Sequence, residues 1–448
     1  MKLLKAFLFL SLINLTAVTA QENKKLTIDE AIRIGLDNSK SLHASKMKTE
    51  SASAKTSETN AARLPSLKLS AGYTRLSEVP PGKFVIPEDA FGPGVPQNPI
   101  VNTIAPSIQN TYTLKATVQQ QLFTGFRLQN NSKAAELSEK ASKEEFEKDK
   151  TDLIYSIRLA YWSLFRAIEV KKVVDENVAQ VSAHLKDAQN LFAQGMITNN
   201  DVLKVQVQLS SVRLLQIDAK NAVELSMINL NNAIGLPLNT QIEIASVIAH
   251  DPLVFQEVSA LIQKASGNRQ DVKAMEARLQ AGEAYVKVAS SGYYPQASVT
   301  GNYYYNRPNN RFFPAKDEFK GSWDLGVNIN FDVWNWGATK YQTKQAQAQV
   351  SQAKDALGLL KDGISLEVTQ NYLSLQKAKE KITVAKESIE QAEESYRITS
   401  EKFKRGVALT TDLLDAEVAV LRAKTDHTDA LVEYELAESK LLKAIGEK

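Results

Sequence analysis

The chain has 448 residues, of which 43% are hydrophobic and 23% are charged, and it contains no cysteine. This length is ample for a sizeable core, and the composition is unlike that of disordered or collagen-like chains. The absence of cysteine excludes disulfide bonds, thiolate metal sites, a cysteine nucleophile and a lipid anchor on an N-terminal cysteine. The formal net charge is +3, and Lys2 and Lys5 supply two of these charges, so the charge balance gives no reason to expect nucleic-acid binding.

Residues 1–20 have the pattern of a secretory signal peptide. The basic segment MKLLK precedes the apolar run AFLFLSLINL, and Val18 and Ala20 then stand at the −3 and −1 positions of a cleavage site after Ala20. A buried N-terminal helix is the alternative interpretation of this run. No later stretch reaches about 18 consecutive apolar residues. We therefore expect the rest of the chain to span a membrane, if it does so, only as a closed β-barrel.

The segment 21–236 is predicted to contain two strands followed by two long helices. In the strand sequence TLKATVQQQLF, apolar and polar residues alternate. Proline is absent from 107–236, which leaves that stretch free to form long helices, whereas seven prolines in 80–106 predict an irregular loop. The expected elements are strands at about 66–76 and 111–123, a long helix at about 128–193 and a return helix at about 200–234.

The segment 237–448 is predicted to repeat this order. The run SWDLGVNINFDV alternates strictly between polar and apolar residues, and residues 315–448 contain no proline. The expected elements are strands at about 297–306 and 322–334, a long helix at about 338–404 and a return helix at about 411–445.

Both long helices show an apolar seam of the kind found in coiled coils, because the apolar residues step by three and four. In the first helix the seam is predicted to continue through Val174, Val178, Val181, Leu185, Ala188 and Phe192. A helix of ~65 residues is roughly 100 Å long at about 1.5 Å per residue. Such a length favours a coiled coil or the wall of a tube over a compact globule.

The two halves of the chain resemble each other, which indicates a tandem duplication. LFAQGMITNNDVLKVQV at 191–207 aligns with KFKRGVALTTDLLDAEV at 402–418, with Gly195 matching Gly406 at an offset of 211 residues. LNNAIG and LLKAIG match at the same offset near the ends of the two halves. Each half therefore supplies one strand pair and one helical hairpin.

The alternating strands fit an outer-membrane barrel better than a soluble sheet. Their polar sides are fully polar, and aromatic residues stand near their ends, as in the girdles of such barrels; these residues are Tyr303, Tyr305, Trp323, Phe123, Trp334 and Trp336. Four strands are too few to close a barrel, and an open edge in lipid would leave backbone groups unpaired. Several copies are thus required: two would give eight strands and three would give twelve.

In this order and repetition, the chain resembles the TolC-like outer-membrane efflux proteins over essentially all of 26–446. The similar segments are LTIDEAIRIGLDNS, RLPSLKLSAGY, QLFTGFR and FDVWNWGATK, and most strongly the tip motifs FAQGMITNNDVL and FKRGVALTTDLLDAE. The resemblance implies a mainly α fold of two tandem repeats. Its long coiled-coil helices would form a periplasmic α-barrel, and four strands per chain would contribute to a shared 12-stranded β-barrel.

The resemblance also implies a set of partners and a location. We expect a homotrimer in the outer membrane of a Gram-negative bacterium, in contact with outer-membrane lipid and extended into the periplasm. It would dock to a periplasmic adaptor protein and to an inner-membrane pump of the resistance-nodulation-division, ABC or another type. Members of the family export drugs, metals, dyes or proteins, and the sequence does not identify the cargo.

The tip motifs supply the candidate site residues. Gly195 and Gly406 are predicted to end the long helices, and Asp201 and Asp412 to open the return helices as capping residues. By resemblance, Asp201, Asp412 and Asp415 are also candidates for an acidic ring at the periplasmic entrance, where carboxylates favour cations. Asp415 is the better gate candidate, because its matching residue in the first half is Lys204 and not a second carboxylate.

Four residues of the tip turns are candidate contacts for an adaptor hairpin, again by resemblance: Gly195, Met196, Gly406 and Val407. Each of them could instead only turn the chain. Family members often carry an arginine two residues after the second glycine, which tethers the closed state. This chain has Ala408 there, so the resemblance does not extend to that lock.

An enzymatic role is not supported by the sequence. The chain contains no Walker, GxSxG or HExxH motif, and the four histidines are widely separated, so we expect no catalytic residues, cofactor or metal site. The predicted function is an outer-membrane exit duct of a tripartite efflux system, gated at its helical tip. The alternatives are a type I protein-secretion duct and, less well supported, a passive porin or a secreted coiled-coil scaffold.

Overall fold

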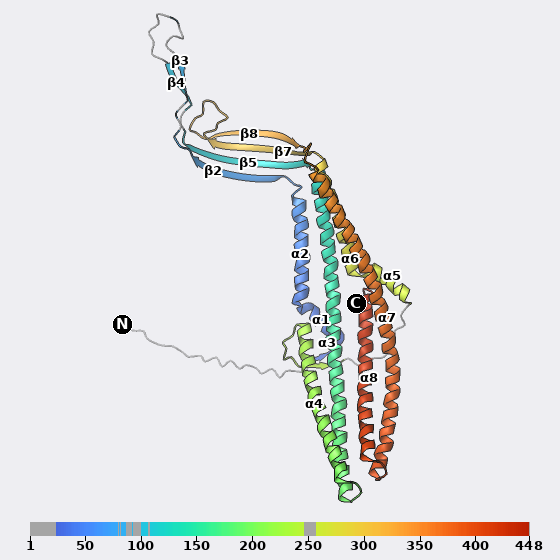
Figure 1. Ribbon diagram of the computed structural model, residues 1–448. Coiled ribbons are helices and arrows are strands. Elements are labelled where there is room, and N and C mark those ends of the chain that lie inside the picture. The colour runs from blue at the N-terminus through green and yellow to red at the C-terminus, as the bar shows by residue number, and fades with distance from the viewer. Residues whose placement is uncertain are drawn as a thin grey trace, which may run out of the picture. The chain divides into compact units, whose positions relative to one another are not determined.

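The computed structural model (Figure 1) describes residues 24–78, 80, 82–86, 92, 100–105, 108–245 and 257–447. The signal peptide predicted for residues 1–20 lies outside the described residues, as does part of the proline-rich segment 80–106. The predicted mainly α fold with very long helices is confirmed, because α3 and α7 each contain 67 residues. Within the described part of the chain, no helix is both long enough and apolar enough to cross a membrane.

The helices in chain order are α1 Ile28–Asn38, α2 Lys40–Ala61, α3 Arg127–Ala193, α4 Asn199–Ile234, α5 Val258–Asn268, α6 Gln270–Ala289, the short 3₁₀ helix η1 Ser290–Tyr293, α7 Ala338–Lys404 and α8 Thr410–Ala444. The strands are β1 Lys24–Leu26, β2 Ser66–Arg75, β3 Gly82–Ile86, β4 Ile100–Ala105, β5 Asn110–Phe123, β6 Ile242–Ile244, β7 Gln296–Arg307 and β8 Lys320–Asn330.

The chain forms two compact units, and each unit draws on both halves of the sequence. The first, here called the helical unit, comprises 1–44, 148–269 and 363–448. The second, here called the sheet unit, comprises 45–147 and 270–362. The predicted boundary at residue 236 therefore separates two sequence repeats, whereas the compact units form where matching segments of both repeats pack together.

The sheet unit contains a four-stranded antiparallel sheet in the order β2-β5-β7-β8 (Figure 1). Each half of the chain thus contributes one adjacent pair of strands. Along β8 the side chains alternate between the two faces of the sheet, and the apolar ones are largely exposed: Leu325 is 69%, Val327 64% and Ile329 68% accessible. This chain alone leaves one whole face of the sheet apolar and uncovered.

The prediction of a strand at 322–334 was wrong at its C-terminal end. β8 ends at Asn330, which pairs with Gln296 at the start of β7. Residues 331–334 continue the alternating pattern but have no partner strand, so no ladder of hydrogen bonds extends over them. The chain then turns into α7 through Trp336 and Gly337, which have φ of 53° and 77°.

The irregular loop predicted for 80–106 is also corrected in part, because β3 and β4 form a short antiparallel hairpin within it. The prolines of this segment stand outside both strands, at positions such as 81, 87, 99 and 106. Proline lacks the N–H that a paired strand requires. The proline-free intervals between these positions are therefore able to pair.

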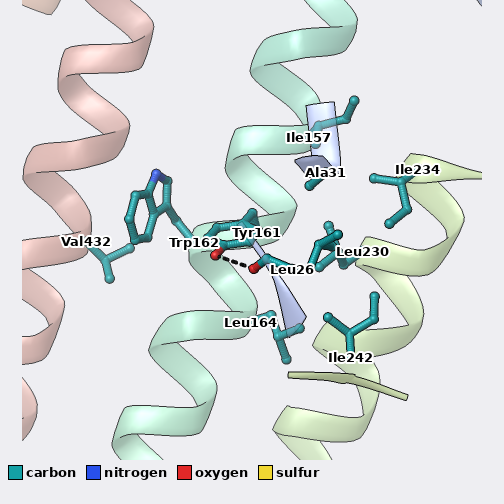
Figure 2. Close-up of a cluster of buried hydrophobic side chains, with 10 residues drawn as sticks. All are labelled: Leu26, Ala31, Ile157, Tyr161, Trp162, Leu164, Leu230, Ile234, Ile242 and Val432. Atoms are coloured by element: carbon teal, nitrogen blue, oxygen red, sulfur yellow. Dashed lines mark hydrogen bonds between the residues drawn. The ribbon is translucent and has the colours of Figure 1, made fainter. Parts of the chain in front are cut away.

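The core of the helical unit forms around the middle of α3 (Figure 2). Tyr161 is fully buried and donates a hydrogen bond of 2.9 Å to the Leu26 carbonyl of β1, while Trp162 packs edge-on against it. Strand β1 pairs in parallel with β6, so the first residues of the two repeats meet here. Val432 of α8 joins the same cluster, which adds the last helix of the second repeat to this core.

Candidate functional site

The two helical hairpins, α3–α4 and α7–α8, end in turns with the same backbone structure. Gly195 and Gly406 adopt left-handed conformations with φ of 73° and 71°, which glycine reaches at little steric cost. In each turn the residue after the glycine donates to a carbonyl five residues back, as in the Schellman motif. These bonds run from Met196 to Leu191 and from Val407 to Lys402, and both measure 2.9 Å.

The two turns contact each other and expose apolar side chains. Met196 and Val407 are 53% and 75% exposed. A Cβ atom at Gly406 would lie 2.7 Å from Cε of Met196, so the methionine side chain crosses directly over the second glycine. The structure thus brings together Met196 and Gly406 from two hairpins, and it leaves apolar surface on the tip.

Asp201 takes part in capping the N-terminus of α4. Its carboxylate accepts hydrogen bonds from the Thr198 hydroxyl at 2.6 Å and the Thr198 N–H at 3.1 Å, and its own N–H donates to the hydroxyl at 3.3 Å. Lys204 adds an ion pair at 3.6 Å. The bonds from the Thr198 side chain and backbone, with a smaller contribution from Lys204, hold the pKa of Asp201 below its usual range. The carboxylate is therefore charged and fixed at the start of α4.

The second turn caps its helix less completely. Leu409 occupies the position that Thr198 has in the first turn, and it offers no side-chain acceptor. Asp412, which was predicted to cap this helix, accepts a hydrogen bond from the Leu409 N–H at 3.3 Å. Asp415 is exposed, and within the described residues its side chain makes no hydrogen bond or ion pair.

A buried polar cluster beside the tip was missed by the sequence reasoning. His184 on α3 directs Nδ1 at the Glu417 carboxylate on α8, and these side chains are 5% and 0% exposed. The Tyr396 hydroxyl of α7 lies 3.3 Å from Nε2 of the same imidazole. Burial, and then the negative charge of Glu417, raises the pKa of Tyr396. The cluster connects one hairpin to the other through three helices.

A shifted seam explains why this cluster was not predicted. The buried stripe of α3 passes through Asn177, Val181, His184, Ala188 and Leu191, whereas the predicted seam ended at Phe192. Polar side chains thus occupy two core positions spaced by seven residues. That spacing is the signal that could have identified His184, because a polar residue in a coiled-coil seam often fixes register.

The apolar residues at the tip pack the two hairpins together, and matching phenylalanines of the two repeats differ in burial. Phe403 of α7 is only 1% exposed, and it packs in one cluster with Leu413 of α8 and Val205 of α4. Phe192, which holds the matching position on α3, is 45% exposed. The second hairpin therefore buries its phenylalanine, whereas the first presents it at the surface.

The described residues were also considered as possible metal ligands. Among them, no group of three or more histidine, aspartate and glutamate side chains is placed to hold a metal ion. What the tip offers is geometric and electrostatic. It has two hydrogen-bonded turns, exposed apolar residues and carboxylates, and the Asp415 carboxylate makes no hydrogen bond or ion pair with any described residue.

Comparisons with known proteins give consistent results. The sequence pattern of the family described as "Outer membrane efflux protein" matches residues 31–236 and 261–447. The chain is 22% identical to outer membrane efflux protein BepC of Brucella suis, over 77% of this chain and 74% of that protein. It is 24% identical to toxin and drug export protein A of Aggregatibacter actinomycetemcomitans, over 70% of this chain and 69% of that protein.

A similar fold is found among solved structures. The crystal structure of the outer membrane protein VceC from Vibrio cholerae matches with a TM-score of 0.76 at 19% identity. The match covers 94% of this chain and 96% of that chain.

Proposed function

This chain belongs to the outer membrane efflux protein family, and we propose that it is the outer-membrane exit duct of a tripartite export system. Its substrates would be delivered by an inner-membrane pump through a periplasmic adaptor, and the chain itself would carry out no chemical step. We further propose a homotrimer, in which the edge strands β2 and β8 of neighbouring copies pair. Twelve strands would then close a shared barrel with no free edge.

The uncovered apolar face of the four-stranded sheet is the observation that carries this proposal. Aromatic side chains bound this face at both ends, as the interfacial girdles of outer-membrane barrels do. At the end near the loops, the Tyr305 and Phe319 rings stack at 5.2 Å. At the end near the helices, the Trp334 and Trp336 rings lie 5.7 Å apart. Outer-membrane lipid is the partner that such a face requires.

The carboxylates of the helical tip are proposed to form the gate of the duct. In a trimer, three copies of Asp412 and Asp415 would ring the entrance, and carboxylate rings favour cations. Among the residues that the structure describes, the Asp415 side chain makes no hydrogen bond or ion pair and Asp412 accepts only the Leu409 N–H at 3.3 Å, so both carboxylates are available to a passing ion. Asp201 contributes less, because Thr198 and Lys204 already surround its carboxylate.

The exposed tip turns are proposed to receive the adaptor. Gly195 and Gly406 leave little bulk at the turns, while Met196 and Val407 supply apolar surface for a helical hairpin. The type of pump behind the adaptor, whether resistance-nodulation-division, ABC or another, would follow from the adaptor that binds there.

The proposal is tested by deleting the gene and measuring the accumulation of a fluorescent dye with and without a plasmid copy. We expect the deletion to raise accumulation and the intact copy to restore export. Native mass spectrometry of the detergent-purified chain should give three copies. A monomer that remains soluble without detergent, or unchanged accumulation together with the absence of channels in bilayers, would contradict the proposal.

A second candidate function is suggested by one of the relatives. The protein of Aggregatibacter actinomycetemcomitans is named for the export of both a toxin and drugs. The same duct could therefore serve a type I protein-secretion system. Comparison of the proteins secreted by wild-type and deletion strains separates the two, because loss of a secreted polypeptide with unchanged dye accumulation would favour this candidate.

A further inference from the structure

The polar face of the four-stranded sheet changes in charge along its length. Toward the helices its side chains are uncharged: Gln119, Gln121, Ser298, Thr300, Asn328 and Asn330. Toward the loops, cross-strand rows on the same face carry Lys68, Lys115, Asp324 and Lys320. Three of these four charges are positive. The face is therefore neutral at one end and basic at the other.

The loop at residues 308–319 adds a further cation and is fastened over this basic end. Asn309 is 3% exposed, and its amide donates to the Lys320 carbonyl at 2.9 Å and to the Ser322 hydroxyl at 3.0 Å. Arg311 donates to the Trp323 carbonyl at 3.1 Å and forms an ion pair with Asp324. The loop thus lies against the polar face and holds its arginine there.

One aromatic ring organises the basic end. Tyr304 is the direct cross-strand partner of Lys115, whose Nζ lies 5.2 Å from the centre of the ring. The guanidinium carbon of Arg311 lies 4.5 Å from the same centre. Cations are attracted to the face of such a ring, so Tyr304 holds two positive groups near one another.

The charges at this end are not balanced. Asp324 is shared between Arg311 and the Asn302 amide, which donates to it at 2.7 Å. Glu318 pairs with Lys320 at 3.0 Å. Within the described residues, Lys68 and Lys115 form no ion pair, although they lie on adjacent strands and on the same face. Two unpaired cations per chain thus remain beside a fixed arginine.

We propose that Lys68, Lys115 and Arg311 form an anion-binding site at the loop end of the duct, which takes phosphate, sulfonate or carboxylate groups of departing cargo. This inference rests on the proposed function, because only in a closed barrel does the polar face line the lumen. Three copies would then place a basic collar at the exit, opposite in sign to the carboxylates at the tip. Rings of basic side chains favour anions in the same way that acidic rings favour cations.

The test uses the purified full-length protein in a planar bilayer, with myo-inositol hexakisphosphate as the probe. The chain contains no cysteine, so an Asn310→Cys variant modified from one compartment by a membrane-impermeant thiol reagent identifies the loop side. We expect the probe to reduce current when added on the loop side, at concentrations that have little effect from the tip side. The reduction should weaken as salt is raised.

Variants distinguish anion binding by the two lysines from the contacts that hold the loop at 308–319 against the sheet. Lys68→Gln combined with Lys115→Gln removes both unpaired charges and leaves the loop contacts intact. We expect the half-blocking concentration to rise by about fivefold or more for each charge lost, the scale of one ion-pair contact in water. Arg307→Gln is the matched control: Arg307 pairs with Asp317 and lies over the Tyr112 ring, on the side of the apolar face.

The outcomes distinguish this inference from the proposed function. Channels that conduct normally but show the same probe block with and without Lys68 and Lys115, or no block at all, would overturn the anion site and leave the duct intact. Equal loss of block in the Arg307→Gln control would also overturn it, because a general surface charge would then account for the effect. Failure of the wild-type protein to form channels would overturn both.

Discussion

The imidazole of His184 faces the carboxylate of Glu417 inside the packed tip region, where neither side chain is accessible to water. His184 belongs to the first hairpin and Glu417 to the second. Their contact is therefore a polar link between the two repeats, placed among apolar residues such as Val181 and Phe403. A buried pair of this kind is costly to break, because the remaining partner is left without compensation.

The first prediction is that Glu417→Ala destabilises the folded protein by about 3–5 kcal/mol, the usual effect of leaving one member of a buried pair alone. Replacing both residues, as in His184→Leu with Glu417→Leu, should recover much of this loss because neither member of the buried pair is then left without the other. Chemical denaturation of the full-length protein, followed by circular dichroism, measures the effect.

Glu401→Ala is the matched control, because Glu401 is an exposed carboxylate that contacts Arg405 only at 3.9 Å. We expect that variant to change the free energy of unfolding by less than about 1 kcal/mol. Equal effects of the two alanine substitutions would show that the buried link contributes nothing specific.

The second prediction concerns the entrance. Asp412→Ala combined with Asp415→Ala should raise single-channel conductance and reduce block by divalent cations added on the tip side, because the acidic ring would lose its charge. Single-channel recording in bilayers measures both quantities.

Two further variants sharpen this test. Asp201→Ala should leave the block largely intact but cost about 1 kcal/mol, the typical loss of a helix cap. Asp426→Ala removes an exposed carboxylate farther along α8 and should change neither property. Block by divalent cations that persists unchanged in the double variant would rule out a gating role for Asp412 and Asp415.

The third prediction is a pH dependence located at Glu435 on α8. Burial, reinforced by the Glu438 carboxylate, raises the pKa of Glu435 to about 7. Between these two pKa values the folded state holds a proton that the unfolded state has lost. The contribution of Glu435 to the free energy of unfolding is therefore fully present below about pH 4.5 and is lost as the pH rises through about 7. Compared with the wild type, Glu435→Gln should therefore raise the free energy of unfolding more at pH 8 than at pH 5.

Unfolding of the wild type and the Glu435→Gln variant across pH 5 to 8 tests this sign. The exposed Glu390→Gln on α7 is the control, and its stability curve should run parallel to that of the wild type. A parallel curve for Glu435→Gln as well would refute the assignment of the pH dependence to this carboxyl.

The fourth prediction compares two adjacent residues of β8. Val327 belongs to the apolar face and Asn328 to the polar face. Val327→Lys would place a charge against lipid, at a cost of about 2–4 kcal/mol near the membrane centre. Asn328→Lys would place the same charge toward water. We expect only the first to reduce the amount of assembled oligomer recovered from outer-membrane fractions; equal recovery would argue against a lipid-facing surface.

The long elements were predictable because their signals are local. Proline is excluded from helix interiors, so the proline-free stretches indicated α3 and α7, and the glycines that require a positive φ marked their ends at Gly195 and Gly406. The alternating pattern likewise located the strands. It failed at residues 331–334, because alternation records which faces are apolar and not whether a partner strand is present.

Tertiary details could not be obtained from the sequence in the same way. Near the tip, the buried seam of α3 runs one residue earlier than predicted, through Asn177 and His184, while the more apolar Val178 and Leu185 are only partly buried. The capping of α8 by Asp412 was expected, but its partner proved to be the Leu409 backbone. Such outcomes depend on distant parts of the chain, which no local pattern describes.

The mixed origin of the compact units has a consequence for biogenesis. The core around Tyr161 includes Val432, and fully buried Leu441 lies near the end of the 35-residue helix α8. Neither unit has all of its parts until the second half of the polypeptide has emerged, so an N-terminal fragment released early by translation or cleavage would have no native partner. The helical unit in particular is complete only when the last helix, α8, has been synthesised.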